Sequence, residues 1–200
     1  MEYFNILYNY SINNILFFLF AYSFIGWSIE SIYVTLKNKK LTNSGFLYGP
    51  FCPIYGIGSV LLLIFLRPFA NNLIIVFVLS FFIASVWEYI AGFIMEIIFG
   101  LKWWDYSKCP LNINGRICLI YSFFWGFLGI ALIKWVHPLI KELLIIMPPL
   151  VITVFVILFI SYYVIDSVFS SMKALKLKEL LNKKHKSLLD YVNKRVVKNK

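Results

Sequence analysis

The chain alternates between long apolar runs and short polar segments rich in lysine, glycine and tryptophan. The apolar runs cover residues 14–36, 51–69, 73–99, 117–136 and 143–169. Each run is close to the roughly 20 residues that a helix needs to cross a bilayer. Because a spanning segment must satisfy its backbone internally, these runs predict an all-α, polytopic membrane helix bundle with about five transmembrane helices. Residues 1–171 form the predicted transmembrane domain.

The pattern changes after residue 171, where apolar residues recur at roughly helical spacing between lysines. Residues 173–200 hold ten Lys and Arg against two acidic residues. This pattern predicts a basic amphipathic helix that lies on the inner leaflet, so residues 172–200 form a basic cytoplasmic tail. A solvated, partly disordered tail is the alternative.

Composition and charge agree with a membrane protein. The 200 residues are 61% hydrophobic and 14% charged, whereas soluble domains carry about 25% charge. The basic residues gather in the loop at 37–40, in the loop at 102–116 and in the tail. By the positive-inside rule, the N-terminus lies outside and the C-terminus lies in the cytoplasm. The many Asn, Lys and Ile residues and few Arg suit a low-GC bacterium, and the expected location is the bacterial inner membrane. Nucleic acid is not an expected partner of the basic tail, because the rest of the chain is embedded in lipid.

The segment GFLYGPFCPIYGIG, residues 45–58, combines four glycines and two prolines with aromatic residues and carries no charge. Irregular backbone is tolerated at membrane depth only where protein buries it or where it lines a polar cavity. We expect a packed turn at the cytoplasmic edge, around which the helices assemble. The alternative is that this segment forms part of a functional cavity.

Four carboxylates lie late in three spans that run from outside to inside: Glu30, Glu88, Glu96 and Asp166. A charged residue at the bilayer centre costs about 2.5–3.5 kcal/mol, so these side chains are not expected to face lipid. The first hypothesis is an acidic cavity, open to the cytoplasm, that binds a cation, a proton or a basic group of a substrate. The second is that the carboxylates pair with Arg116 or with neutral donors and lock the bundle.

The polar loop LKWWDYSKCPLNINGR, residues 101–116, is the second distinctive segment. Its aromatic residues suit the headgroup layer, and its Asn and Gly residues suit tight turns. Asp105 can cap a turn or pair with Arg116. The loop is either an interfacial plug or a lid that contacts substrate. The candidate cavity residues from the two polar segments and the start of the second span are Tyr48, Tyr55, Trp104, Asp105, Tyr106, Asn112 and Arg116.

Motifs for the common enzyme classes do not occur in the sequence. It contains no P-loop, no GxSxG and no HExxH, and its two histidines fall on opposite predicted sides of the membrane. The three cysteines lack metal-binding spacing and are expected to be reduced. We therefore predict no catalytic residues, no metal site and no cofactor, although a membrane enzyme that acts on lipid with carboxylates alone stays open.

Three segments resemble a family of small bacterial membrane proteins, the ABC-transporter type IV or CmpB-like permeases. The matching text is GFLYGPFCPIYGIG, WEYIAGFIMEIIFGLKWWDYS and LNINGRICLIYSFFWG. Their order and spacing also match, and the resemblance covers about residues 18–138. Residues that match the family pattern are Glu30, Gly45, Tyr48, Gly49, Pro50, Pro53, Tyr55, Gly56, Glu88, Trp104, Asp105, Tyr106, Asn112, Gly115 and Arg116.

The resemblance implies a permease subunit of a transporter. Because the chain has no nucleotide-binding motif, ATP hydrolysis would need a separate ATPase subunit, and five spans would have to form a homo-oligomer or join other chains. Membrane lipids are the other expected partners. The alternatives are a lipid-modifying or lipid-binding membrane enzyme that acts at the inner interface, and a non-catalytic membrane regulator that signals through its tail.

Overall fold

The computed structural model describes residues 10–198, and the side chains of residues 10–184. Helices dominate these residues, and the only strands among them form one short antiparallel hairpin. In chain order the elements are α2 (Ile12–Asn38), α3 (Pro53–Leu66), the 3₁₀ turn η1 (Arg67–Phe69), α4 (Leu73–Phe99), β1 (Asn112–Ile113), β2 (Ile117–Cys118), α5 (Leu119–Ala131), the π-helical segment η2 (Leu132–Val136), α6 (His137–Ile146) and α7 (Pro149–Lys198).

The structure confirms an all-α bundle but changes the number of long spans. Four helical stretches in the described residues have the length and apolar composition to cross a membrane: Ile12–Asn38, Leu73–Phe99, Leu119–Ile146 and Pro149–Lys184. The predicted second span is shorter, since only Pro53–Phe69 is helical. The glycine-rich backbone before Pro53 is not helical, and Pro53 itself supplies the first turn of α3. At about 1.5 Å per residue, this helix is shorter than the hydrocarbon core.

Proline decides the helix ends in the second half of the chain. The predicted fourth span ends at residue 136, but the helix continues to Ile146. Pro138 cannot donate a backbone hydrogen bond, and the helix widens into the π turns of η2 just before it instead of ending. The predicted fifth span begins at residue 143, whereas α7 begins at Pro149, after an extended Met147. The tail does not form a separate helix, because α7 continues without interruption to Lys198.

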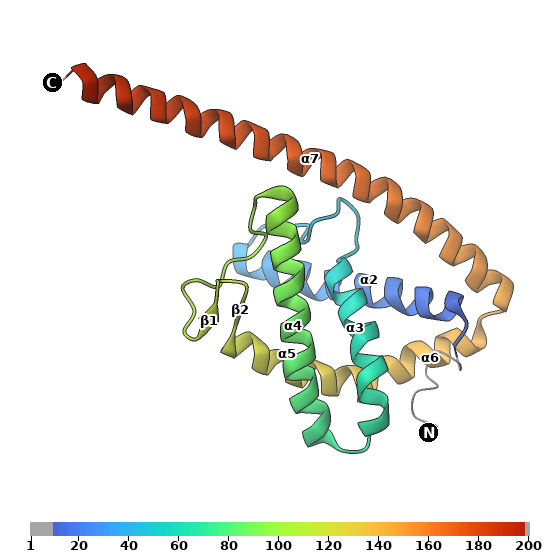
Figure 1. The fold of residues 1–200 in the computed structure, drawn as a ribbon. Coiled ribbons are helices and arrows are strands. Elements are labelled where there is room, and N and C mark those ends of the chain that lie inside the picture. Colours follow the sequence, from blue (N-terminus) through green and yellow to red (C-terminus); the bar gives the residue numbers. More distant parts are fainter. Residues whose placement is uncertain (1–9, 199–200) are drawn as a thin grey trace.

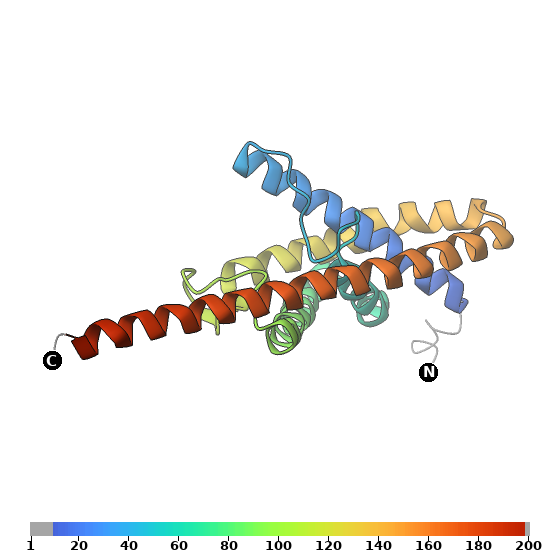
Figure 2. The ribbon, with the colours of Figure 1, turned by 90° about the horizontal axis from the view of Figure 1, so that it is seen from above.

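The adjacent helices α3 and α4 form the middle of the bundle: α2 packs against α3, α5 packs against α4, and α7 packs mainly against α2. Figure 1 shows α3 and α4 side by side, with the continuous stretch from α5 to α6 crossing them. The long α7 passes the C-terminal end of α4 and the loop that leads into α3. In Figure 2 the long α7 extends well beyond the other helices toward the C-terminus. Close approach depends on glycines: a Cβ at Gly26 would strike the ring of Tyr55 on α3, and one at Gly129 would strike Ser80 on α4. Small residues at such positions allow helix backbones to approach in membranes.

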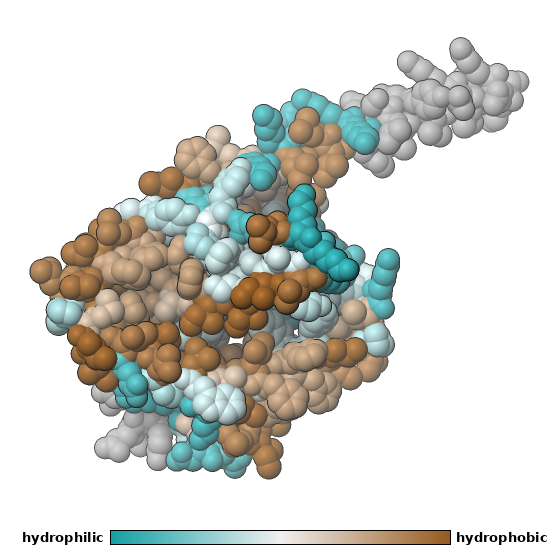
Figure 3. Space-filling model, turned by 180° about the vertical axis from the view of Figure 1, so that it is seen from behind, coloured by the Kyte–Doolittle hydropathy of each residue, from teal (hydrophilic) through white to brown (hydrophobic). Residues whose placement is uncertain are grey.

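Apolar side chains cover much of the surface of this bundle. Figure 3 shows hydrophobic residues across the middle of one face, with hydrophilic residues gathered toward the top and bottom of the view. Many large apolar side chains on the long helices are more than half exposed, among them Ile74, Phe82, Ile97, Phe127 and Leu158. Water would penalise so much exposed apolar surface, whereas lipid does not. The exposed apolar surface and the four long apolar helices together identify a multi-pass membrane protein.

Candidate functional site

The glycine-rich segment between α2 and α3 is anchored to α7 by one carboxylate. Asp166, 5% exposed, accepts the backbone N–H of Tyr48 at 2.9 Å and that of Gly49 at 2.7 Å. Ser170, one turn further along α7, donates its hydroxyl to the same carboxylate at 2.9 Å. A Cβ at Gly49 would collide with the hydroxyl of Tyr162, so only glycine lets the backbone approach α7 this closely. Asp166 therefore acts as the acceptor that fixes this loop.

Glu30 lies in the last third of α2 and contacts the loop between α2 and α3. Its carboxylate accepts the hydroxyl of Ser44 and lies 3.8 Å from the thiol of Cys52. The phenol of Tyr55 also faces this carboxylate from the first turn of α3. Neighbouring bonds hold the segment in place, since the indole of Trp27 donates to Asn43 at 2.6 Å. The groups around Glu30 are neutral donors that come from the loop and from α3.

The loop between α4 and α5 folds into a hairpin whose turn the sequence predicts. Asn114 and Gly115 both have positive φ, 54° and 71°, and the N–H of Arg116 bonds to the carbonyl of Ile113 at 3.0 Å. Asn and Gly are the residues that most readily adopt positive φ at both central positions of such a turn, and Arg116 makes the connection between the paired Ile113 and Ile117 three residues long. Asn112 accepts the N–H of Gly115 at 3.0 Å and donates to the carbonyl of Cys109 at 2.8 Å. Asn112 is thus a turn residue.

Glu88 lies in the interior of the bundle, at the middle of α4, and is 4% exposed. One carboxylate oxygen accepts the phenol O–H of Tyr106 at 3.0 Å, and the other accepts the indole N–H of Trp125 at 2.7 Å. Within the described residues no lysine or arginine forms a salt bridge with it. The hairpin loop supplies one donor and α5 supplies the other. Glu88 is therefore a buried carboxylate held only by neutral donors.

Glu96, two turns further along α4, has a different environment. Arg116 donates to one of its oxygens from both Nε and a terminal nitrogen, at 3.2 and 2.8 Å. The guanidinium also lies over the rings of Tyr89 and Phe93, with centroid distances of 5.1 and 5.2 Å. The backbone carbonyl of Arg116 accepts the indole N–H of Trp104 at 2.9 Å. This pair fastens the hairpin to α4, as the second sequence hypothesis for the carboxylates expects.

The remaining candidates divide between the loop surface and its interior. Asp105 is exposed, and its carboxylate accepts the N–H and hydroxyl of Ser107 and lies 3.9 Å from Lys102. It caps a turn and does not pair with Arg116, which binds Glu96 instead. The hydrogen bonds from Ser107 lower the pKa of Asp105 below its ordinary value. Burial, followed by the nearby charge of Glu88, raises the pKa of the Tyr106 phenol, which keeps this donor protonated.

The candidates therefore form two clusters instead of one ring of carboxylates. Glu30 and Asp166 contact the glycine-rich segment, whereas Glu88 and Glu96 contact the hairpin loop. Tyr55 lies between the clusters, since it faces Glu30 and its ring lies 5.9 Å from that of Trp125, the partner of Glu88. Every buried side-chain nitrogen and oxygen in the described part of the chain has a hydrogen-bond partner.

Trp125 is the functional candidate that the sequence interpretation missed. It sits inside an apolar run, where a tryptophan is normally read as packing. The sequence carried one signal for this role, because a buried indole N–H needs an acceptor and Glu88 is one of few acceptors in the spans.

Tyr48 differs from the other candidates because it is 53% exposed. It lies beside an open cavity of about 390 Å³ that Tyr162 and Asp166 also line. Lys173 lies over the ring of Tyr48 at 4.6 Å from its centroid.

Comparison with known proteins gives one match, to a family described as "Putative ABC-transporter type IV". The family model matches residues 16–171, which is most of the chain and includes both loops and all four carboxylates. The chain belongs to this family. No curated protein and no solved structure matches it. The family description and the apolar helical bundle together support a membrane protein linked to transport.

Proposed function

We propose that this chain is the membrane-spanning permease subunit of a bacterial transporter, and that a separate polypeptide hydrolyses ATP. Membership of the family supports a role in transport. The sequence contains no nucleotide-binding motif, so the energy source would be a partner. The distribution of Lys and Arg supports an N-terminus outside and a C-terminus in the cytoplasm, where the basic tail from residue 172 would meet the inner leaflet or the ATPase.

The observation that carries the proposal is the environment of Glu88. A buried carboxylate is costly unless it is paired or well hydrogen-bonded, and here neutral donors alone satisfy it. A carboxylate in this setting can exchange its neutral partners for a proton, a cation or an ammonium group. The pairing of Glu96 with Arg116 leaves that second carboxylate already neutralised. Glu88 is accordingly the proposed coupling residue, and Tyr106 and Trp125 are the proposed gate that holds it at rest.

The proposed path runs from Glu88 toward the cytoplasmic loops. Tyr55 and Glu30 would extend it toward the glycine-rich segment, and Tyr106 would close it from the hairpin loop. Glu96, Arg116, Trp104, Asp105 and Asn112 would hold the hairpin in position, and Tyr48 would line the mouth near α7. The hydrogen bonds from both loops to these carboxylates support a path whose opening requires loop movement.

The test purifies the tagged full-length chain from its native membrane in a mild detergent and identifies co-purified proteins by mass spectrometry. We expect an ATPase in stoichiometric amount. The complex is then placed in nanodiscs and its ATP hydrolysis is compared for wild type, Glu88→Gln and Glu142→Gln, the last being an exposed glutamate on α6. Glu88→Gln should lower the rate at least about tenfold with the complex intact, since about 1.4 kcal/mol of lost coupling has this effect.

Two results would contradict the proposal. A chain that purifies alone would remove the ABC-type coupling, and turnover of a lipid by that isolated chain would favour lipid chemistry instead. An ATPase complex in which Glu88→Gln hydrolyses ATP like Glu142→Gln would leave the transporter assignment standing but remove Glu88 from the coupling step.

A further inference from the structure

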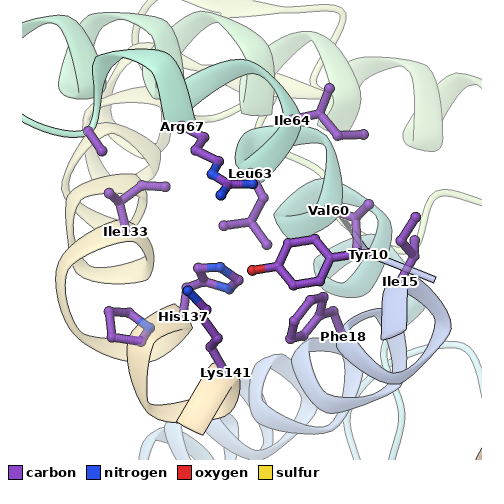
Figure 4. A pocket seen from close by; sticks show the side chains of 12 residues that line it. Tyr10, Ile15, Phe18, Val60, Leu63, Ile64, Arg67, Ile133, His137 and Lys141 are labelled. Atoms are coloured by element: carbon purple, nitrogen blue, oxygen red, sulfur yellow. The ribbon is translucent and has the colours of Figure 1, made fainter. Parts of the chain in front are cut away.

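A second cavity lies near the end of the bundle that carries the η1 turn, away from the carboxylates. It encloses about 250 Å³ between the start of α2, the end of α3 and the junction of η2 with α6. Figure 4 shows Arg67, His137 and Lys141 directed toward a common space, with the hydroxyl of Tyr10 pointing into it. None of these residues belongs to the two carboxylate clusters.

One wall of this cavity is apolar. It is formed by side chains from three helical elements: Ile15, Phe18, Val60, Leu63, Ile64 and Ile133. The buried ones, Phe18 and Leu63, belong to the hydrophobic core of the bundle, which fixes the position of this wall. A hydrocarbon chain can pack against such a wall favourably, because the contact leaves no polar group without a hydrogen-bond partner.

The opposite side of the cavity is cationic. Arg67 and Lys141 are exposed, and neither forms a salt bridge with any carboxylate among the described residues. The guanidinium of Arg67 lies over the ring of Tyr10, 5.8 Å from its centroid, which keeps it at the cavity. Two cations without an acidic partner, beside an apolar wall, are complementary to an anion that carries a hydrocarbon chain.

The backbone places His137 at this cavity. Its N–H bonds back to the carbonyl of Leu132, five residues earlier, which is the π-type bond that widens the helix. The ring nitrogen Nδ1 of His137 lies 2.7 Å from the hydroxyl of Tyr22 on α2. With Nδ1 engaged by Tyr22, Nε2 is the ring nitrogen available to a ligand in the cavity, which His137 lines. π-helical segments are rare and often accompany functional sites.

We infer that this cavity binds the head group of an anionic phospholipid. Arg67 and Lys141 bind the phosphate, His137 and Tyr10 offer further hydrogen bonds, and the apolar wall takes the first part of an acyl chain. The volume of the cavity limits how much of the lipid can enter, because pockets that hold whole drug-sized ligands measure about 300–1,000 Å³. A cavity of about 250 Å³ holds a head group and leaves the rest of the lipid in the bilayer.

The test titrates the full-length chain in mild detergent with dioleoylphosphatidylglycerol and, separately, with dioleoylphosphatidylcholine, and counts bound lipid by native mass spectrometry. Wild type should prefer the anionic lipid. The variant Arg67→Gln/Lys141→Gln should bind it about thirtyfold more weakly, and each single variant about fivefold, from about 1 kcal/mol per cation. The matched control is Lys134→Gln, an exposed cation of η2 that does not line the cavity and should have no effect.

A second variant probes the apolar wall. Val60→Phe should weaken binding of phosphatidylglycerol while both cations stay in place. Equal affinity for the two lipids, or equal loss in the Lys134→Gln control, would overturn the proposal. It would also be overturned if glycerol 3-phosphate displaced the lipid at similar concentration, because the site would then bind a soluble phosphate. Binding that appears only after deletion of residues 2–9 would show that the chain's own N-terminal segment fills the cavity, which also overturns it.

Discussion

Replacement of Asp166 tests whether one side chain anchors the glycine-rich segment. The carboxylate accepts two backbone N–H groups, from Tyr48 and Gly49, and the hydroxyl of Ser170. A hydrogen bond to a charged group contributes about 1.5–3 kcal/mol, and a buried donor left without a partner carries its own penalty. Asp166→Ala should therefore lower the free energy of unfolding by about 3–5 kcal/mol. Asp166→Asn keeps one acceptor oxygen but turns an N–H₂ group toward a backbone donor, so we expect a loss of about 2–3 kcal/mol.

The assay is reversible unfolding in mixed micelles by titration with dodecyl sulfate, followed by tryptophan fluorescence. Ser170→Ala is the comparison variant: it removes one neutral donor from the same carboxylate and one acceptor, at 3.2 Å, of the Tyr48 N–H, but it leaves the carboxylate in place and should cost about 1–2 kcal/mol. Hydrogen exchange gives a local readout, since the amides of Tyr48 and Gly49 should exchange at least about tenfold faster in Asp166→Ala. The reasoning is refuted if Asp166→Asn unfolds within about 0.5 kcal/mol of wild type, or if the two amides exchange at unchanged rates.

Three further predictions concern helix packing, the hairpin and acid stability. Gly26→Ala places a methyl group against the ring of Tyr55 and should destabilise the bundle by about 1–3 kcal/mol, which a thermal shift assay detects. Glu96→Gln and Arg116→Gln should each cost about 1–3 kcal/mol, and the double variant less than their sum; additive losses would show that the pair does not interact. The folded pKa of Asp105 is lowered from 3.8, so its contribution to stability is present above that pH and lost as the pH falls through the folded pKa. Asp105→Asn should remove this dependence in melts between about pH 2 and 5. A loss of stability on acidification that is the same in the variant as in wild type would contradict the assignment.

Much of the architecture follows from the order of residues alone. Long apolar runs can satisfy their backbone in lipid only as helices, so the helical bundle was predictable. The family was predictable from the three segments that resemble it. The Asn114-Gly115 turn was predictable too, because few pairs adopt positive φ at both central positions. The helix ends were harder, since Pro138 stops a helix in some contexts and here only widens it into the π segment.

The sequence by itself determined that four carboxylates lie in apolar spans and must find partners. Only the tertiary structure decided which partners. Arg116 could have bound Asp105 or Glu96, and the fold of the hairpin places its guanidinium against Glu96. Glu88 received Tyr106 and Trp125, which lie 18 and 37 residues away along the chain. Such pairings depend on how helices pack and where loops return, and local residue preferences carry no information about either.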